Sequence, residues 1–203
     1  NQRKPQPAAY GEMQLMTEIH SDDPRIQAFW QGYLSSLPAD AIAPIEPPQA
    51  WHFMDEPEAS DELGAQMQAQ IQSAADELGA LVVAGIKTAT ASLEWVYAAE
   101  EEPLPQPGDL SIILNWAGDP LCLIRTTEVR RIPFNLVDAR FAYDEGEDDR
   151  SLENWRRVHW RFVSRECAAI GREPAQDMPV VCERFEVLYR PPNPGVQAGI
   201  SLT

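Results

Sequence analysis

The stretch Gly85-Ile86-Lys87-Thr88-Ala89-Thr90-Ala91-Ser92 follows a long amphipathic segment and precedes the β-rich second half of the chain. Three hydroxyl side chains and one amine fall within its last six residues. The chain has 14 Arg and 2 Lys, and Lys4 lies near the N-terminus, so Lys87 is the single lysine of the expected folded part. Because an ammonium is a compact charge whose pKa shifts readily on burial, Lys87 is a candidate functional residue. The alternative is a solvated lysine just past a helix C-terminus, where the helix dipole favours a cation.

Four segments in the same order and spacing resemble one known family. They read G-I-K-T-A-T-A-S, P-G-D-L-S-I-I-L, F-A-Y-D-E-G-E-D-D-R-S-L-E-N-W and V-V-C-E-R-F-E-V-L-Y. Together they are similar to an ASCH domain of the PUA-like superfamily, over about residues 78–190. The broader family signature is G-x-K-x-x-E-x-R, whereas this chain has Thr90 and Ser92 at the last two positions. The sequence is therefore identified as a member of the K-x-x-T branch.

The resemblance implies both a fold and an activity. It implies an α+β fold in which a small, closed or nearly closed PUA-like β-barrel of about five or six strands is surrounded by helices. Bacterial relatives of the K-x-x-T branch are N4-acetylcytidine amidohydrolases that use a Lys, a Thr and a Glu. The matching positions here are Lys87, Thr90 and Glu145. A threonine hydroxyl needs a base to become a nucleophile, a desolvated lysine can be that base, and a carboxyl group can return the proton to the departing amine.

Other residues of the expected cleft are candidates for ligand contact. Thr88 and Ser92 supply the remaining hydroxyls of the opening stretch, and Trp95, Tyr97 and Trp116 are aromatic rings on which an RNA base can stack. Aromatic side chains are more often part of a core, and that alternative stays open for all three. Ser92 is also expected to cap a short helix that runs to about Glu100.

The segment Asp144–Asp149 holds five carboxylates in six residues. For Glu147, Asp148 and Asp149 we expect a solvated loop that places anionic charge near the N-terminus of the helix beginning after Ser151. The spacing does not match an EF-hand, and no pair of histidines has metal-ligand spacing, so we expect no resident metal or other cofactor. His159 lies beside Trp160 and is expected in a core or an interface.

Charge is distributed unevenly along the chain. Residues 1–109 carry 18 acidic against 4 basic side chains, a net charge of −14, whereas residues 110–203 carry 14 against 12, a net charge of −2. An acidic protein repels phosphate backbones at long range, so we expect no DNA partner and no indiscriminate nucleic-acid binding. The expected ligand is RNA or a modified nucleoside.

Hydrophobic periodicity and turn residues divide the chain into four parts. We expect a tail over 1–21, a helical N-terminal extension over 22–77, the ASCH domain over 78–190 and a C-terminal tail over 191–203. Asp23 and Pro24 open the first helix, and a single apolar stripe predicts a second helix from about Glu58 to Ala84, which Gly85 ends. The extended second helix has a near-repeat within it and offers a surface for a partner or a homodimer. A hairpin is expected over 110–129, a short helix from Asn135, a helix from Ser151 to about Ile170, and a last strand over 180–189.

Three cysteines are far apart and odd in number, and no apolar run approaches a membrane span. We therefore expect buried, reduced thiols in a cytoplasmic protein that has no membrane partner.

Two alternatives to the amidohydrolase stay open. The chain can be a non-catalytic RNA-binding or adaptor module, or a ribonuclease that depends on a divalent metal.

Overall fold

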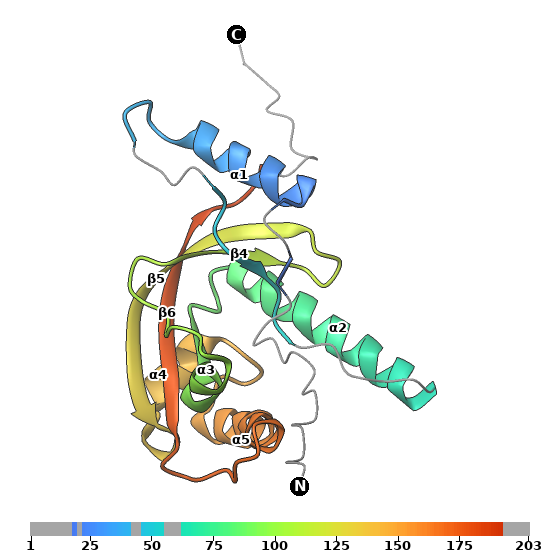
Figure 1. Ribbon diagram of the computed structural model, residues 1–203, viewed down its shortest axis with the longest axis vertical. Coiled ribbons are helices and arrows are strands. Elements are labelled where there is room, and N and C mark those ends of the chain that lie inside the picture. Colours follow the sequence, from blue (N-terminus) through green and yellow to red (C-terminus); the bar gives the residue numbers. More distant parts are fainter. Residues whose placement is uncertain (1–17, 20–21, 42–45, 55–61, 193–203) are drawn as a thin grey trace, which may run out of the picture.

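The computed structural model describes residues 18–19, 22–41, 46–54 and 62–192, which form an α+β fold around one mixed sheet (Figure 1). The helices are α1 (Pro24–Ser36), α2 (Glu62–Val83), α3 (Glu94–Glu100), α4 (Ala139–Glu145) and α5 (Leu152–Ala169), with a 3-10 turn at Phe134–Leu136. The strands are β1 (Glu18–Ile19), β2 (Ala50–Trp51), β3 (Ala89–Leu93), β4 (Leu110–Leu114), β5 (Pro120–Pro133) and β6 (Pro179–Tyr189).

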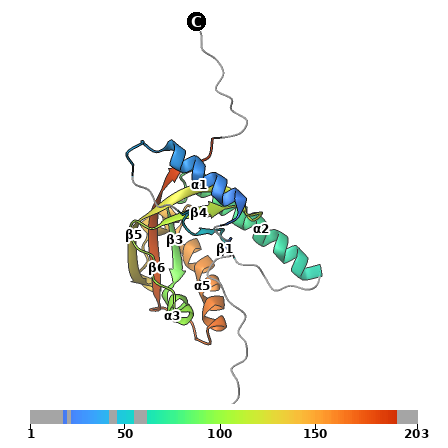
Figure 2. The same ribbon diagram turned by 45° about the horizontal axis from the view of Figure 1, so that its top comes forward.

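The six strands form one sheet in the order β1-β2-β4-β5-β6-β3. The long antiparallel pair β5 and β6 curves through its centre, and β3 lies along the outer edge of β6 (Figure 2). The two edge strands β1 and β3 do not pair with each other, so the expected closed barrel is wrong and the sheet is open. Just before β3, the Thr88 N–H donates to the carbonyl of Asp144 in the last turn of α4, so α4 rather than β1 is the neighbour of this edge of the sheet.

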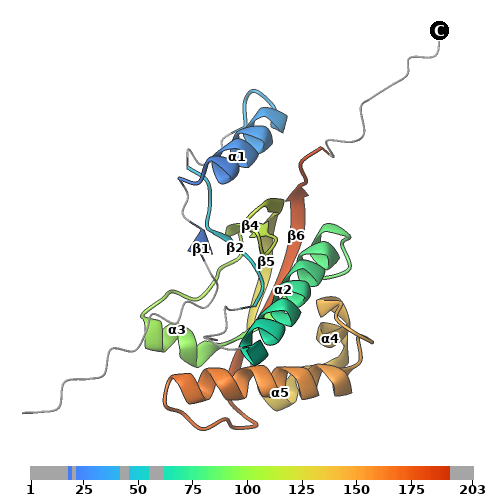
Figure 3. The same ribbon diagram turned by 90° about the vertical axis from the view of Figure 1, so that its right-hand side faces the viewer.

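Helices cover the sheet from different ends. In Figures 1 and 3, α1 lies at one end of the sheet and α5 at the other, while α2 lies along its side. Apolar side chains from β3, β6, α4 and α5 form one core cluster, which includes Ala89, Leu93, Phe141, Trp155 and Cys182. A second cluster, under α2 and on the other side of the central strands, includes Trp51, Phe53, Val82 and Phe185.

Most helix boundaries agree with the sequence. Asp23 caps α1 by accepting the Arg25 N–H, and Gly85 has the left-handed φ of +71° that a helix stop favours. Ser151 caps α5 by accepting the Asn154 N–H. The expected cap at Ser92 is wrong: the cap position of α3 is Leu93, and the Ser92 hydroxyl is instead paired with the Tyr97 hydroxyl.

Two short strands lie where the sequence indicated no regular structure. β1 falls within the expected tail, and β2, which lies between the two expected helices of the N-terminal extension, pairs in parallel with β4. Part of the near-repeat, residues 59–61, lies outside the described residues. The three cysteines are buried and unpaired, as expected. None of the helices in the described part of the chain combines the length and apolar character that a bilayer span requires.

Candidate functional site

Lys87 is one of the largest fully buried side chains of the described structure. Only 1 % of its surface is exposed. The left-handed turn at Gly85 ends α2, and the N–H groups of Ile86 and Lys87 both donate to the carbonyl of Leu81. This tight turn directs the chain into β3 and carries the ammonium inward. The alternative of a solvated lysine after a helix stop is therefore excluded.

The Lys87 ammonium lies between two carboxylates. Its Nζ donates to Glu145 Oε2 at 3.0 Å and to Glu147 Oε1 at 2.6 Å, and it lies 5.3 Å from the centre of the Phe53 ring. The other Glu145 oxygen accepts the indole N–H of Trp155 at 2.8 Å and lies 3.4 Å from Nε2 of His159. We call Lys87, Glu145, Glu147 and His159 the Lys87 cluster.

The first turns of α5 supply the aromatic side of this cluster. Trp155 and His159 are four residues apart, so they share a helix face, and their rings stack at 4.2 Å. His159 Nδ1 lies 3.0 Å from the Trp155 carbonyl, so an imidazolium can donate to that carbonyl and to Glu145 at the same time. The cluster then holds two positive and two negative charges, and this balance allows ions to persist in an apolar setting.

Burial and charge act in opposite directions on each pKa. For Lys87, burial lowers the pKa, but the Glu145 and Glu147 carboxylates outweigh it and raise the pKa above its usual value. For Glu145, burial raises the pKa, but Lys87, His159 and the Trp155 hydrogen bond lower it to about 2. For His159, burial is likewise outweighed, chiefly by Glu145, and the pKa is raised. At neutral pH Lys87 is therefore an ammonium and Glu145 a carboxylate.

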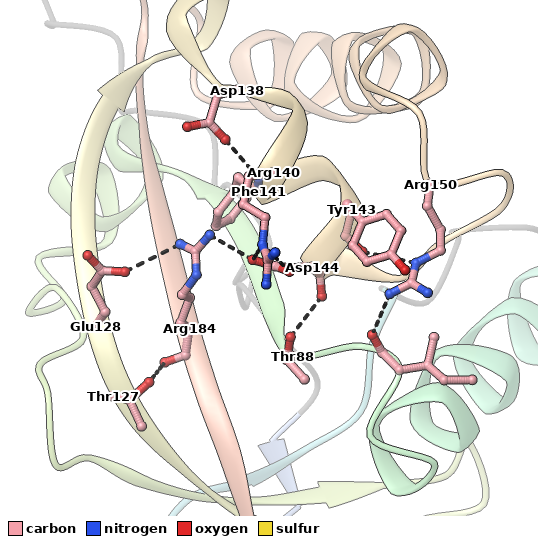
Figure 4. Close-up of polar contacts among 11 residues, drawn as sticks. Thr88, Thr127, Glu128, Asp138, Arg140, Phe141, Tyr143, Asp144, Arg150 and Arg184 are labelled. Carbon is pink, nitrogen blue, oxygen red and sulfur yellow. Dashed lines mark hydrogen bonds and ion pairs between the residues drawn. The ribbon is translucent and has the colours of Figure 1, made fainter.

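A second set of polar contacts fixes the end of α4 that carries Glu145 (Figure 4). Asp144 accepts from Arg184 at 2.8 Å and from Arg140 at 3.1 Å, and Arg184 also pairs with Glu128. Burial raises the pKa of Asp144, and the two guanidinium groups outweigh this effect and lower it. The Thr88 hydroxyl donates to the Asp144 carbonyl at 3.2 Å, which ties the start of β3 to α4.

Gly146 permits the close approach of α4 to the Lys87 backbone. It has φ +76°, and a Cβ there would lie 2.6 Å from the Ile86 carbonyl oxygen and 2.9 Å from the Lys87 nitrogen. Arg150 lies beside this contact. It donates to the Tyr143 carbonyl, and its guanidinium lies 3.7 Å from the centre of the Tyr143 ring. Backbone contact thus places Glu145 and Lys87 together.

The family of the chain follows from comparison with known proteins. A family model described as "ASCH domain" matches residues 64–189. The chain belongs to the ASCH domain family.

Two solved structures resemble this ASCH domain over most of their length. An ASCH domain from Lactobacillus crispatus is 33% identical to this chain. The match covers 83% of this chain and 96% of that domain, with a TM-score of 0.64. A protein of Enterococcus faecalis is 35% identical to this chain. The match covers 81% of this chain and 88% of that protein, with a TM-score of 0.65. No functionally curated protein matches the chain significantly.

The structure brings together Lys87 and Glu145 but separates Thr90 from them. The Thr90 hydroxyl makes no hydrogen bond to any described residue, and the ladder partner of Thr90 is Glu183. Neighbouring residues of a strand point to opposite faces, so Thr90 faces away from the core that Ala89 and Ala91 enter. Thr90 and the Lys87 cluster therefore adjoin the same edge strand from different sides.

The remaining expected ligand contacts are scattered. The Ser92 hydroxyl is paired with the buried Tyr97 hydroxyl at 2.9 Å, and Thr88 is engaged with Asp144. Trp95 is half-buried under the Arg172 guanidinium at 4.7 Å. Trp116 packs against the His52 ring at 4.7 Å, and its backbone N–H donates to Asp76. Neither tryptophan contacts the described Lys87 cluster.

Two members of the Lys87 cluster were missed by the sequence analysis. Glu147 was expected in solvent, yet it is half-buried on Lys87, whereas Asp148 and Asp149 are exposed as expected. His159 was expected in a core or an interface, without a charged partner. Its spacing of four from Trp155 was the available signal, since it places both side chains on the helix face that meets α4.

Space beside the cluster is small. A hollow lined by Glu147, Asp148, Asn154, Trp155 and His159 has a volume of about 10 Å³, room for about one water molecule. Within the described residues, no group of three or more His, Cys, Asp or Glu side chains is arranged to hold a metal ion.

Proposed function

We propose that this ASCH domain binds RNA or a modified nucleoside at the Lys87 cluster, and that N4-acylcytidine is a nucleoside that it hydrolyses. The observation that carries the proposal is the buried Lys87 ammonium, the one lysine of the described structure. A buried charge with a strongly perturbed pKa is a common mark of a functional site, although structural ion pairs share it. The resemblance of the G-I-K-T-A-T stretch to the K-x-x-T branch supports the choice of nucleoside.

Glu147 is the partner that a ligand oxygen can replace. Its side chain is 25% exposed, whereas that of Glu145 is 1% exposed. Asp148 and Arg150 are non-glycine residues with positive φ, so the backbone that follows Glu147 is held in a costly conformation. A carbonyl or phosphate oxygen that displaces Glu147 would take over its hydrogen bond from Lys87. Because the present hollow admits about one water molecule, ligand binding in this proposal includes a movement of Glu147.

The charge states modify the catalytic roles inferred from sequence. An ammonium cannot accept a proton, so Lys87 acts in this proposal as an electrostatic holder of a ligand oxygen. Glu145 is ionised at neutral pH and keeps Lys87 charged and oriented. Among the cluster members, His159 rather than Glu145 carries a proton that a departing amine could receive.

Turnover of N4-acetylcytidine, followed by its absorbance change between pH 6 and 9, tests the enzymatic part. We expect Lys87→Arg to retain part of the ligand binding and to lose hydrolysis, because the guanidinium fork cannot take the position of the ammonium. We expect Lys87→Met to lose both, and Arg130→Met, which removes an exposed cation on β5, to lose neither. Absence of turnover by the folded parent protein would exclude this substrate.

A non-catalytic RNA-binding module is the second candidate, and one observation favours it. The Lys87 cluster is closed in the described structure, and its charges are already balanced without a substrate. RNA affinity that falls in Lys87→Met, together with no turnover by the parent, would support this candidate.

A further inference from the structure

A group of polar side chains lies on the sheet face opposite to the core of β3 and α5. Glu183 of β6 is opposite both Thr90 of β3 and Val129 of β5 in the ladders. Directly paired residues of antiparallel strands share a face, with their β-carbons about 4.5–5.5 Å apart. Thr126 is on the same face, because its hydroxyl donates to Glu183 Oε2 at 3.2 Å. We call Thr90, Thr126 and Glu183 the Glu183 group.

Glu183 is a carboxyl group on the sheet that has no cationic partner among the described residues. It has no salt bridge to any described cation, whereas its strand neighbours Arg184 and Glu186 both form ion pairs. The Thr126 hydroxyl is its single hydrogen-bond donor in the described structure, so the second carboxyl oxygen is unused. A partly buried carboxyl group without a cationic partner is costly to ionise. Its ladder partner Thr90 carries a hydroxyl that likewise has no hydrogen bond to a described residue.

The groups that act on the Glu183 carboxyl are acidic or neutral. Burial raises the pKa of Glu183, Thr126 lowers it, and Asp109, just before β4, raises it, so that it reaches about 7. From α3 the facing group is Tyr97, whose own pKa is raised to about 12 by burial and by Glu183, Glu100 and Glu102, against the Ser92 hydrogen bond. Tyr97 is therefore a neutral phenol at physiological pH.

We propose that Glu183 is the proton acceptor for the Thr90 hydroxyl, and that these two residues form the reacting pair of the domain. The inference rests on the proposed hydrolase function for its substrate, an N4-acylated cytidine. It assigns to Glu183 the role that the charged Lys87 cannot fill. Lys87 and Thr90 are three residues apart along the edge of the sheet, about 10 Å at ~3.3 Å per residue, so the pair lies near the Lys87 cluster but on the other face of the strand.

The reaction balances with these two residues and one water molecule. Thr90 Oγ forms a bond to the acyl carbon as its proton passes to the Glu183 carboxylate. The bond between the acyl carbon and N4 then breaks, and N4 takes that proton to leave as the cytidine amine. Water next adds to the acyl-threonine ester with Glu183 accepting one proton. The ester C–O bond breaks, Thr90 Oγ regains a proton from Glu183, and the carboxylic acid departs.

Two measurements on the full chain test the pair. The first is a carbon NMR titration of carboxyl-labelled glutamate, with the Glu183 signal assigned by its loss in Glu183→Gln. We expect that signal to titrate near neutral pH and its midpoint to move in Thr90→Val. Titration in the ordinary glutamate range, or no response to Thr90→Val, would overturn the pairing whether or not the protein has activity.

The second measurement is hydrolysis of N4-acetylcytidine. We expect Glu183→Gln to lower kcat/KM by ~10²-fold or more and to remove the rise of kcat/KM through neutral pH, with nucleoside binding retained. The matched control is Glu186→Gln, which changes an exposed carboxylate on the same strand and should leave the profile unaltered. Parental turnover in Glu183→Gln overturns the assignment, whereas a parent without turnover overturns the hydrolase proposal and leaves the titration to decide the pair.

Discussion

Lys87 shows how a single side chain can be held in the charged state within an apolar interior. Its ammonium loses hydration on burial, and two carboxylates within hydrogen-bond distance compensate for that loss. The compensation is mutual, since Glu145 remains ionised only because Lys87 and His159 are beside it. Removing one member of the cluster should therefore lower the free energy of unfolding by more than the lost interaction alone, because its former partners remain buried without a counter-charge.

We expect Lys87→Met to lower the free energy of unfolding by about 3–5 kcal/mol, as is usual when one partner of a buried ion pair is deleted. Glu145→Gln should also destabilise the fold, and the double variant Lys87→Met/Glu145→Gln should lose less than the sum of the two single losses. Urea denaturation of the four proteins gives this coupling. Additive losses would mean that the two side chains do not share a buried interaction.

The pH dependence of stability should have an acidic limb due to Glu145. Its pKa falls from 4.5 to about 2 on folding, so the unfolded chain binds more protons between these values. The stabilisation is therefore present above about pH 4.5 and is lost as the pH falls toward 2. Thermal unfolding between pH 2 and 5 should show a steeper slope in the parent than in Glu145→Gln. Equal slopes would contradict the depressed pKa.

His159 should produce an opposite limb. Its pKa is raised above 6.5 on folding, so its stabilisation is complete below pH 6.5 and is lost as the pH rises through the folded value. We expect His159→Gln to flatten the decline of stability above pH 6.5. A decline that persists unchanged in this variant would show that the imidazole is neutral in the folded protein.

The joint between α4 and α5 is the element that brings the charges together. Glu145 ends α4, Gly146 makes the left-handed stop, and Ser151 begins α5, so two short-range turns place Glu145, Glu147 and His159 around Lys87. The joint depends on close backbone contact with Ile86 and Lys87, which a side chain at position 146 would prevent.

We expect Gly146→Ala to destabilise the protein more than Gly171→Ala. Both glycines end helices with φ near +70°, so both substitutions carry the cost of a left-handed alanine, ~1 kcal/mol or more. A Cβ at Gly171 meets nothing within 4 Å, whereas at Gly146 it overlaps the backbone at Ile86 and Lys87. Urea denaturation should therefore give a larger loss for Gly146→Ala, and equal losses would show that α4 shifts freely.

Local chemistry explains which elements could be predicted from sequence. The helix at Pro24, the stop at Gly85 and the cap at Ser151 were correct because each depends on a few adjacent residues. The strand Ala89–Leu93 was missed because its alanines and hydroxyl residues resemble a loop, and its pairing with β6 is a contact between residues about 90 positions apart. The face that Thr90 takes could not be predicted either, because motif order does not specify which face of a strand a side chain occupies.

At the scale of the whole molecule, positive charge is concentrated in the second half of an acidic chain. On α5, Arg157, Arg161 and Arg165 are exposed and recur every four residues, so they lie along one helix face at intervals of about 6 Å. None of the three forms a salt bridge with a described carboxylate, unlike Arg25, Arg125 and Arg131. The same helix supplies Trp155 and His159 to the Lys87 cluster from another of its faces, because successive residues are about 100° apart around a helix.

We expect this arginine face to contact the phosphates of a bound RNA strand. The double variant Arg161→Glu/Arg165→Glu should weaken binding of a single-stranded RNA, and losing two phosphate contacts should reduce the slope of log affinity against log salt by about 1.4. Arg157 is left in place because it is hydrogen-bonded to Asn154 and helps to shape the start of α5. Arg130→Glu is the control, since Arg130 is an exposed arginine of β5 that also has no salt bridge within the described structure. Fluorescence anisotropy across a salt series would measure both effects, and an equal loss in the control would mean that net charge, rather than the face of α5, governs RNA binding.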